Sequence, residues 1–298
     1  MPPGVRADGG VNETALLIAH FEATNGSGWR LDHRNGNDTQ VVYSAGGEQY
    51  RRDDRGAAWY TDGLLVTNRT LLGAPYEMES ARNTTAMPSR PTGGITLALG
   101  VRMYTSNYRA VGTTEVAGRT LYELRMAGTK DAGASLGHYT GRMLVDESGR
   151  IHRLTGEIGD NESVADTYDF DYEWGVDAVP RPPWLDRIPR GVVEKTPDGT
   201  ALNVTLTGSA ALPAGTELAF RHNGTRRTVT LDDALAPGES LYVGLRTDGD
   251  ERTVAVGREP LDGGGLLDLQ GRQTRLSGTT TVEGSEVDLS FVVGWHDF

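Results

Sequence analysis

Apolar residues near the N-terminus recur at the spacing of a helix. Leu16, Leu17 and Phe21 fall on one side of a helical projection. Asn12 is a favourable N-cap, because its side-chain oxygen can accept a hydrogen bond from a free backbone N–H. Gly26 is a typical residue at which a helix ends. The pattern therefore predicts an early helix that begins after Asn12 and ends near Gly26.

Most of the remaining chain predicts antiparallel strands. Alternating apolar and polar residues, separated by turn sequences, indicate strands from Trp29 to about Thr70, for example at 39–44, 49–52 and 57–61. Further strands are expected at 121–126, 139–145, 150–158 and 165–174. Residues 95–104 have the composition of a short helix, and residues 73–93 show no clear period, so we expect a loop there. On the last of these strands four aromatic residues are spaced by two, which favours a core that faces a helix over an apolar wall of a binding site.

A proline-rich segment divides the chain. Four prolines fall within residues 180–190, which predicts a stiff, extended linker. Beyond it, seven short strands are expected at 201–207, 217–221, 225–231, 240–246, 252–256, 275–282 and 286–293. Seven strands in a segment of this length are typical of an immunoglobulin-like β-sandwich. The expected organisation is a first domain over 1–179, a linker over 180–190 and a second domain over 191–298.

The composition of the chain is typical of a halophilic protein and argues against nucleic-acid binding. The chain of 298 residues has a net charge of -12, no cysteine, and 27 arginines against two lysines, Lys130 and Lys195. A dispersed excess of acidic residues keeps a protein hydrated where salt screens charge, which indicates a halophilic protein. A GC-rich genome alone would also favour arginine over lysine. Because no basic cluster could neutralise phosphates, we expect no nucleic-acid partner.

The asparagines give the strongest indication of cellular location. Eight of the ten asparagines begin an Asn-x-Ser/Thr sequence in which x is not proline. Chance would give one or two at roughly this serine and threonine content. We therefore expect N-glycosylation, and with it export to the cell surface, at Asn12, Asn25, Asn37, Asn68, Asn83, Asn161, Asn203 and Asn223. Asn12 also has the structural explanation of a helix cap.

No catalytic motif or metal-ligand spacing is recognisable. None of the six histidines has the spacing of a metal-ligand pair, and the sequence lacks a nucleophile elbow, a phosphate loop and a dinucleotide fingerprint. Alternating carboxylates at Asp169, Asp171 and Glu173 are expected in so acidic a chain without a calcium site. We therefore expect no enzyme, no cofactor and no metal. The longest apolar run, residues 15–19, is far too short to span a bilayer.

Three segments of the first domain are distinctive: Pro2-Pro3-Gly4-Val5, the helix over 15–23, and the segment that runs from Asp171 to Trp184. On these segments, residues 1–185 resemble a haloarchaeal family of exported lipoproteins of unassigned function. The family resembles the LolA/LppX/RseB type of fold, which implies a strongly curved antiparallel sheet, half a barrel, wrapped around helices. The family also implies a lipobox cysteine upstream, which this chain does not contain. Any membrane attachment would then use an anchor that this sequence does not contain.

The expected fold class is therefore mainly β, with an α+β N-terminal domain followed by the immunoglobulin-like sandwich. A curved sheet with helices on its concave face can enclose an apolar cleft, as in carriers of acyl chains. The same side chains, packed tightly, would form an ordinary core, and both alternatives stay open from the sequence. The candidate cleft residues are Leu17, Phe21, Trp59, Leu99, Met103, Phe170 and Tyr172.

Three functional interpretations follow. The first is a non-enzymatic, N-glycosylated cell-surface protein of a halophilic archaeon that binds other surface proteins or copies of itself. The second is a carrier or sensor of lipids or lipoproteins that uses the cleft. The third is a structural component of the envelope or of a surface filament. A hydrolase with an unrecognised site is the weakest alternative.

Overall fold

The computed structural model describes residues 1–69, 71, 73, 75–82, 90–130, 138–159, 166–249, 251–262 and 264–294. The chain forms two compact units. Unit 1 contains residues 1–54 and 91–180, and unit 2 contains residues 55–90 and 181–298. The fold is mainly β, as expected.

Two helices belong to unit 1. Helix α1 (Glu13–Gly26) and helix α2 (Gly93–Tyr104) confirm both helices expected from the sequence. The predicted cap of α1 is also confirmed, because Asn12 Oδ1 accepts a hydrogen bond from the backbone N–H of Ala15 at 3.1 Å. Each helix buries a face at intervals of three or four residues, Leu16 and His20 among them on α1.

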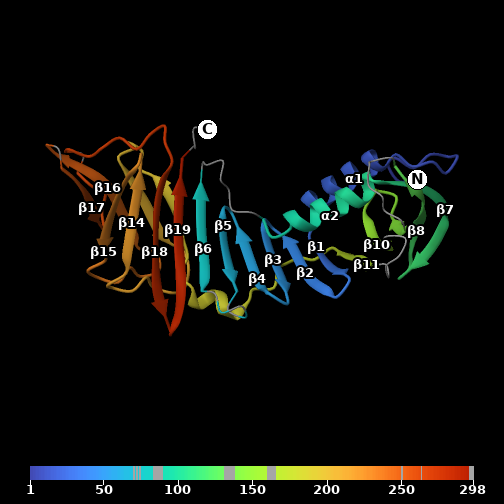
Figure 1. Cartoon of the computed structure of the whole chain (residues 1–298), viewed down its shortest axis with the longest axis horizontal. Coiled ribbons are helices and arrows are strands. Elements are labelled where there is room, and N and C mark those ends of the chain that lie inside the picture. Colours follow the sequence, from blue (N-terminus) through green and yellow to red (C-terminus); the bar gives the residue numbers. More distant parts are fainter. Residues whose placement is uncertain are drawn as a thin grey trace. The chain divides into compact units, whose positions relative to one another are not determined.

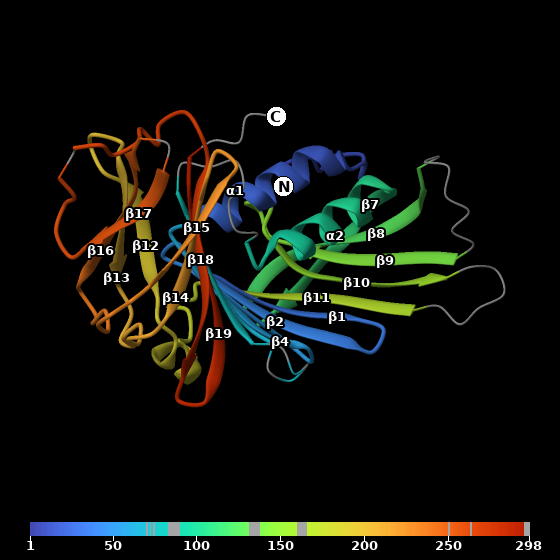
Figure 2. The same ribbon diagram turned by 60° about the vertical axis from the view of Figure 1, so that its left-hand side comes forward.

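Unit 1 is built on an open, curved antiparallel sheet. Its strand order is β3-β2-β1-β11-β10-β9-β8-β7. The strands are β1 (Trp29–Asn35), β2 (Asp38–Ala45), β3 (Glu48–Asp53), β7 (Ser106–Val116), β8 (Arg119–Thr129), β9 (His138–Val145), β10 (Ile151–Gly159) and β11 (Asp166–Trp174). Figures 1 and 2 both show α1 and α2 side by side over one face of these strands.

The aromatic strand lies at the centre of this sheet. Strand β11 pairs with β1 on one side and β10 on the other, so its inward side chains face the helices. Tyr168, Phe170 and Tyr172 are buried, and Trp174 is half-buried against the same cluster. The structure thus confirms the expectation that the aromatic stripe is core packed against a helix. Trp174 Nε1 donates to the carbonyl of Ile151 at 3.1 Å, which satisfies its polar atom.

Unit 2 contains two sheets. In one the order is β15-β14-β18-β19-β6-β5-β4, and in the other it is β12-β13-β16-β17. The first sheet contains β4 (Gly56–Thr61), β5 (Leu64–Asn68), β6 (Tyr76–Arg82), β14 (Glu217–His222), β15 (Thr225–Thr230), β18 (Thr274–Val282) and β19 (Ser285–Val293). The second contains β12 (Gly191–Lys195), β13 (Ala201–Leu206), β16 (Ser240–Asp248) and β17 (Glu251–Gly257).

A parallel pair joins the two sequence segments of unit 2. Strand β19 pairs in parallel with β6, so that Val287 lies beside Tyr76 and Val293 beside Arg82. The alternating inward residues of these strands are buried, with Met78, Leu289 and Phe291 at 1–3% exposure. Residues 56–82 therefore extend one sheet of the C-terminal strands. The expected division had assigned these residues to the first domain.

Most of the predicted strands are confirmed, and three elements differ. All seven strands expected after residue 200 are present as β13 to β19. The loop expected over 73–93 is wrong in part, because residues 76–82 form β6. Strands β7 and β12 were not predicted. Residues 83–89 lie outside the described residues.

The proline-rich segment is folded rather than extended. Residues Pro183–Arg187 form a short 3₁₀ helix, and Leu185 and Ile188 are fully buried in unit 2. The Trp184 ring packs near the Tyr76 ring, with 6.0 Å between centroids. Apolar side chains between the prolines thus anchor the segment. The expectation of a stiff extended linker over 180–190 is therefore wrong.

Candidate functional site

Four of the predicted glycosylation sites are exposed in the structure. Asn25 lies in the last turn of α1, Asn37 in the turn between β1 and β2, and Asn223 in the turn between β14 and β15. Asn12 is exposed at the start of α1, where its oxygen serves as the cap. An exposed turn is the environment that N-glycosylation requires.

The other sequons are placed less favourably. Asn68 on β5 and Asn203 on β13 are half-buried within sheets, between neighbouring strands. The Thr205 hydroxyl of the Asn203 sequon is hydrogen-bonded with Ser240 at 2.8 Å. Asn83 and Asn161 lie outside the described residues. We therefore expect Asn25, Asn37 and Asn223 to carry sugars more readily than Asn68 and Asn203.

The candidate cleft residues of unit 1 form a filled core. Leu99, Met103 and Phe170 have 0% exposure and Tyr172 has 7%, and all four belong to one cluster beneath the helices. Leu17 and Phe21 are half-buried against the same cluster. A closely packed set of side chains leaves no volume among them for an acyl chain. The geometry of these described residues thus favours the filled alternative.

Trp59 lies elsewhere. It belongs to β4 of unit 2, is 3% exposed, and has the Arg190 guanidinium carbon 5.5 Å from its ring centroid. Arg190 is itself 5% exposed and lies 3.8 Å from a carboxylate oxygen of Asp186. The structure therefore places Trp59 in the packing of unit 2, in a different unit from the other six candidates.

Two histidines of unit 1 lie among aromatic residues, His20 fully buried and His33 half-buried. Burial lowers the pKa of His20 to about 3, and burial together with the charge of Arg102 lowers the pKa of His33 to about 4. His20 Nδ1 accepts a hydrogen bond from the Ile151 backbone N–H, and His33 Nδ1 accepts one from the Gln40 side-chain amide at 2.8 Å. Both imidazoles are therefore neutral near pH 7, and His20 belongs to the core.

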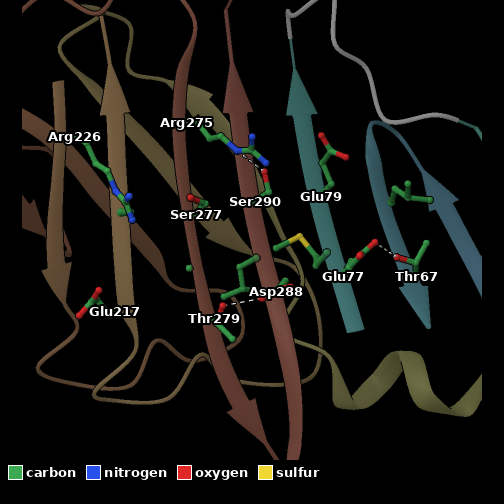
Figure 3. Close-up of a pocket in the computed structure, with 15 residues that line it drawn as sticks. Thr67, Glu77, Glu79, Glu217, Arg226, Arg275, Ser277, Thr279, Asp288 and Ser290 are labelled. Atoms are coloured by element: carbon green, nitrogen blue, oxygen red, sulfur yellow. Dashed lines mark hydrogen bonds between the residues drawn. The ribbon is translucent and has the colours of Figure 1, made fainter. Parts of the chain in front are cut away.

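Unit 2 carries an open groove of about 630 Å³ on the outer, polar face of one sheet. Figure 3 shows the lining side chains, which come from β5, β6, β14, β15, β18 and β19. The strand register arranges them in rows. One row contains Glu217, Thr279, Asp288 and Glu77. The next row, two residues along each strand, contains Ala219, Ser277, Ser290 and Glu79.

The rows differ in charge. Carboxylates dominate the first row, the middle row consists of small side chains and Glu79 at its β6 end, and Arg275 and Arg226 lie beyond it (Figure 3). Successive rows are about 7 Å apart, because two residues of a strand rise that far. The groove thus has an acidic side and a basic side across a floor of small side chains. Among the described residues, the side-chain charges of Glu79, Glu217 and Arg226 have no ion-pair partner.

Several groove hydroxyls are held by neighbouring strands. The Thr279 hydroxyl donates to Asp288 Oδ1 at 2.7 Å, and Arg275 Nε donates to Ser290 Oγ at 3.1 Å. These contacts fix the orientation of the floor and leave further lone pairs and N–H groups for a ligand. The arrangement suits hydrogen bonding to a polar ligand that carries charge.

A second polar depression, of about 510 Å³, lies on unit 1 over β9, β10 and β11. Most of its charged groups are already paired: Arg142 and Arg125 both bind Glu123, and Arg153 binds Asp169 at 2.7 Å. The hydrogen bonds from these arginines lower the pKa of Glu123 to about 2. Groups that satisfy one another offer less to a ligand, so the groove of unit 2 is the better candidate binding site.

The described residues contain no group of three histidine, aspartate or glutamate side chains that could hold a metal ion. None of the helices in the described part of the chain has the length and apolar character needed to cross a membrane. The groove residues were missed from the sequence. Their signal, polar residues at alternate positions of β18 and β19, is shared by any half-exposed strand.

Comparisons with known proteins complete the description. No protein-family model matches the sequence, and no curated protein matches it. Among solved structures, the fold is similar to that of MucB, in a crystal structure of MucB in complex with MucA(peri). The TM-score is 0.33 and the sequence identity is 13%, and the match covers 94% of this chain and 92% of that chain.

Two mycobacterial structures are similar over a shorter part of the chain. LprF from Mycobacterium bovis has a TM-score of 0.33 and 12% identity, over 57% of this chain and 96% of that chain. The Mycobacterium tuberculosis lipoprotein LppX has a TM-score of 0.32 and 12% identity, over 56% of this chain and 99% of that chain.

Proposed function

We propose that this chain is an exported, N-glycosylated cell-surface protein of a halophilic archaeon that acts by binding and not by catalysis. Its binding site is the groove of unit 2, and its partner is a polar, charged segment of another surface protein. The groove is the observation that carries the proposal. It is open, it presents charges of both signs that have no ion-pair partner among the described residues, and most of its floor is made of small side chains.

The ligand class follows from the chemistry of the lining. Carboxylates and hydroxyls accept and donate hydrogen bonds, and the arginines on the far side bind anionic groups. An acyl chain would leave these groups unpaired, which costs free energy for each buried polar atom. The filled core of unit 1 supports the same choice, because the apolar candidate residues are packed against one another.

Composition and sequons support the location. Export to the cell surface explains the excess of glycosylation sequences. Adaptation to a high-salt environment explains the net charge of -12 and the scarcity of lysine. At molar salt the screening length falls to about 3 Å, so recognition must rely on contact and not on long-range attraction. A groove that presents hydrogen-bonding groups at contact distance suits these conditions.

The test compares two tyrosine substitutions on the same strand. Ser277→Tyr fills the floor of the groove, and Thr281→Tyr adds the same ring on the same strand outside the lining. Neither Ser277 nor Thr281 makes a side-chain hydrogen bond within the described residues, so neither substitution removes one. The labelled full chain is titrated against washed envelope fragments of its host in molar salt.

We expect Ser277→Tyr to weaken binding by at least about tenfold, which corresponds to about 1.4 kcal/mol. Thr281→Tyr should bind like the unmodified chain, and both variants should keep its melting temperature. Equal binding by both variants would contradict the assignment of the groove. A tightly bound lipid in native mass spectra of the unmodified chain would instead favour the carrier interpretation.

A further inference from the structure

Helix α2 has an outward face that does not fit a solvent-exposed helix. Ile95, Leu99 and Met103 form its buried face. On the opposite side Leu97, Val101 and Tyr104 are 68%, 52% and 70% exposed. A helix at a protein surface normally places charged and polar residues on that side.

The outward face of α2 also carries no charge. The single charged residue of the helix is Arg102, whose guanidinium donates to Asn35 Oδ1 at 3.0 Å and lies 4.0 Å from the ring centroid of Tyr168. Tyr168 is buried in the sheet, so Arg102 is directed away from solvent. In a chain whose residues are 23% charged, an uncharged apolar helix face in water indicates a surface that is covered in the working protein.

The spacing of residues along the outward face of α2 indicates that another helix covers it. Gly93, Leu97, Gly100 and Tyr104 follow one another at intervals of four, three and four residues, which is the spacing of a helix–helix seam. The seam alternates a glycine with a large side chain. Among the described residues, Gly93 has no atom within 4 Å of the position of a Cβ, and Gly100 has only the end of the Leu17 side chain at 3.9 Å.

This alternation is self-complementary under a two-fold axis. When two copies of α2 pack antiparallel about a centre between Ala98 and Leu99, Leu97 of one copy faces Gly100 of the other. In the same register Tyr104 faces Gly93. Each large side chain of the seam thus meets a glycine, where the missing side chain leaves room for it.

We propose that two copies of this chain associate through the outward faces of α2. The exposed side chains of Leu97, Val101 and Tyr104, together with Ile18 of α1 at 53% exposure, offer roughly 300 Å² of apolar surface per copy. A stable dimer buries about 800 Å² per partner, of which somewhat more than half is apolar. The patch is therefore the centre of an interface of modest size, and we expect micromolar association. The inference does not depend on the groove of unit 2.

The first test is sedimentation velocity of the full chain between about 1 and 100 µM, in 0.15 M and 2 M NaCl. The unmodified chain should dimerise, and more strongly in 2 M NaCl, where charge repulsion is screened. Val101→Glu should weaken the dimer at least about tenfold, and glutamate favours a helix more than valine does. Val116→Glu is the matched control, because Val116 is 44% exposed at the end of β7 and away from the seam.

Two glycine variants test the seam itself. Gly93→Leu fills the space that should receive Tyr104 and should weaken the dimer. Gly26→Leu makes the same change at the end of α1, away from the outward face of α2, and should leave the dimer intact. Among the described residues neither Gly93 nor Gly26 has an atom within 4 Å of its Cβ position, so both variants should fold.

Cross-linking tests the register. The chain has no cysteine, so Gly93→Cys combined with Tyr104→Cys should give a disulfide-linked dimer on oxidation. The two positions are about 16 Å apart along one helix, which excludes a bond within the chain. A monomer at 100 µM in both salts, or a dimer that survives Val101→Glu, would overturn the proposal. So would a monomer whose binding to vesicles of phosphatidylglycerol and phosphatidylcholine is lost in Val101→Glu, since the face would then contact lipid.

Discussion

His20 predicts a defined loss of stability in acid. Its side chain is fully buried, its Nδ1 accepts a hydrogen bond from the Ile151 backbone N–H at 3.2 Å, and the rings of Tyr172 and Trp174 lie edge-on at 5.0 and 5.6 Å. Nε2 therefore carries the proton and has no hydrogen-bond partner among the described residues. A second proton on Nδ1 would break the bond to Ile151 and place a charge in the core.

The sign and size of the effect follow from the two pKa values. Burial lowers the pKa of His20 from 6.5 to about 3 in the folded state, while the unfolded chain keeps the ordinary value. Between these values the unfolded state binds one proton more than the folded state, so stability falls as the pH falls. The contribution is complete above pH 6.5 and is lost at about 1.4 kcal/mol per pH unit below it. At pH 5 the loss is about 2 kcal/mol.

The assay is chemical unfolding of the full chain at intervals between pH 4 and pH 7. His20→Gln keeps an acceptor for the Ile151 N–H and removes the titrating group, so the dependence of unfolding free energy on pH should become shallower by about 1.4 kcal/mol per unit. His33→Gln should act in the same direction, over the narrower range from 6.5 to its pKa of about 4. An unchanged slope in His20→Gln would refute the interpretation of His20 as a buried neutral imidazole.

Two further substitutions test the packing. Gly28→Ala should destabilise unit 1 by about 3 kcal/mol or prevent folding, because its Cβ would lie 1.8 Å from the carbonyl oxygen of Val176. Gly26→Ala should change the melting temperature little, because no atom of the described part of the chain lies within 4 Å of its Cβ position. Lys195→Met should cost unit 2 about 2 kcal/mol in chemical unfolding, since the Lys195 ammonium donates to backbone carbonyls of the 269–272 segment. An unchanged midpoint in either Gly28→Ala or Lys195→Met would contradict the contact concerned.

Local patterns were sufficient to predict most of the elements. The cap at Asn12, both helices and the aromatic strand β11 follow from spacing over a few residues, because helix and strand periods are set by local backbone geometry. The interpretation of the aromatic stripe as core is likewise confirmed. The short 3₁₀ helix at Pro183–Arg187 was missed because the prolines outweighed the apolar residues between them.

Long-range pairing could not be predicted from the same patterns. Strands β6 and β19 are about two hundred residues apart in sequence, and nothing in either segment specifies a parallel partner. Strand β7 was missed because it is an edge strand, exposed along most of its length and interrupted by irregular pairing near Gly112. The groove depends on the pairing of β6 with β19 and so was not visible in the sequence.

The claim that the chain works outside the cell can be tested most directly on protein isolated from its native host. Glycopeptide mass spectrometry would report the occupancy of each sequon. The account predicts sugars at the exposed turn sites Asn25, Asn37 and Asn223, and lower occupancy at Asn203 within its sheet. Unmodified asparagines at all of these positions would contradict it.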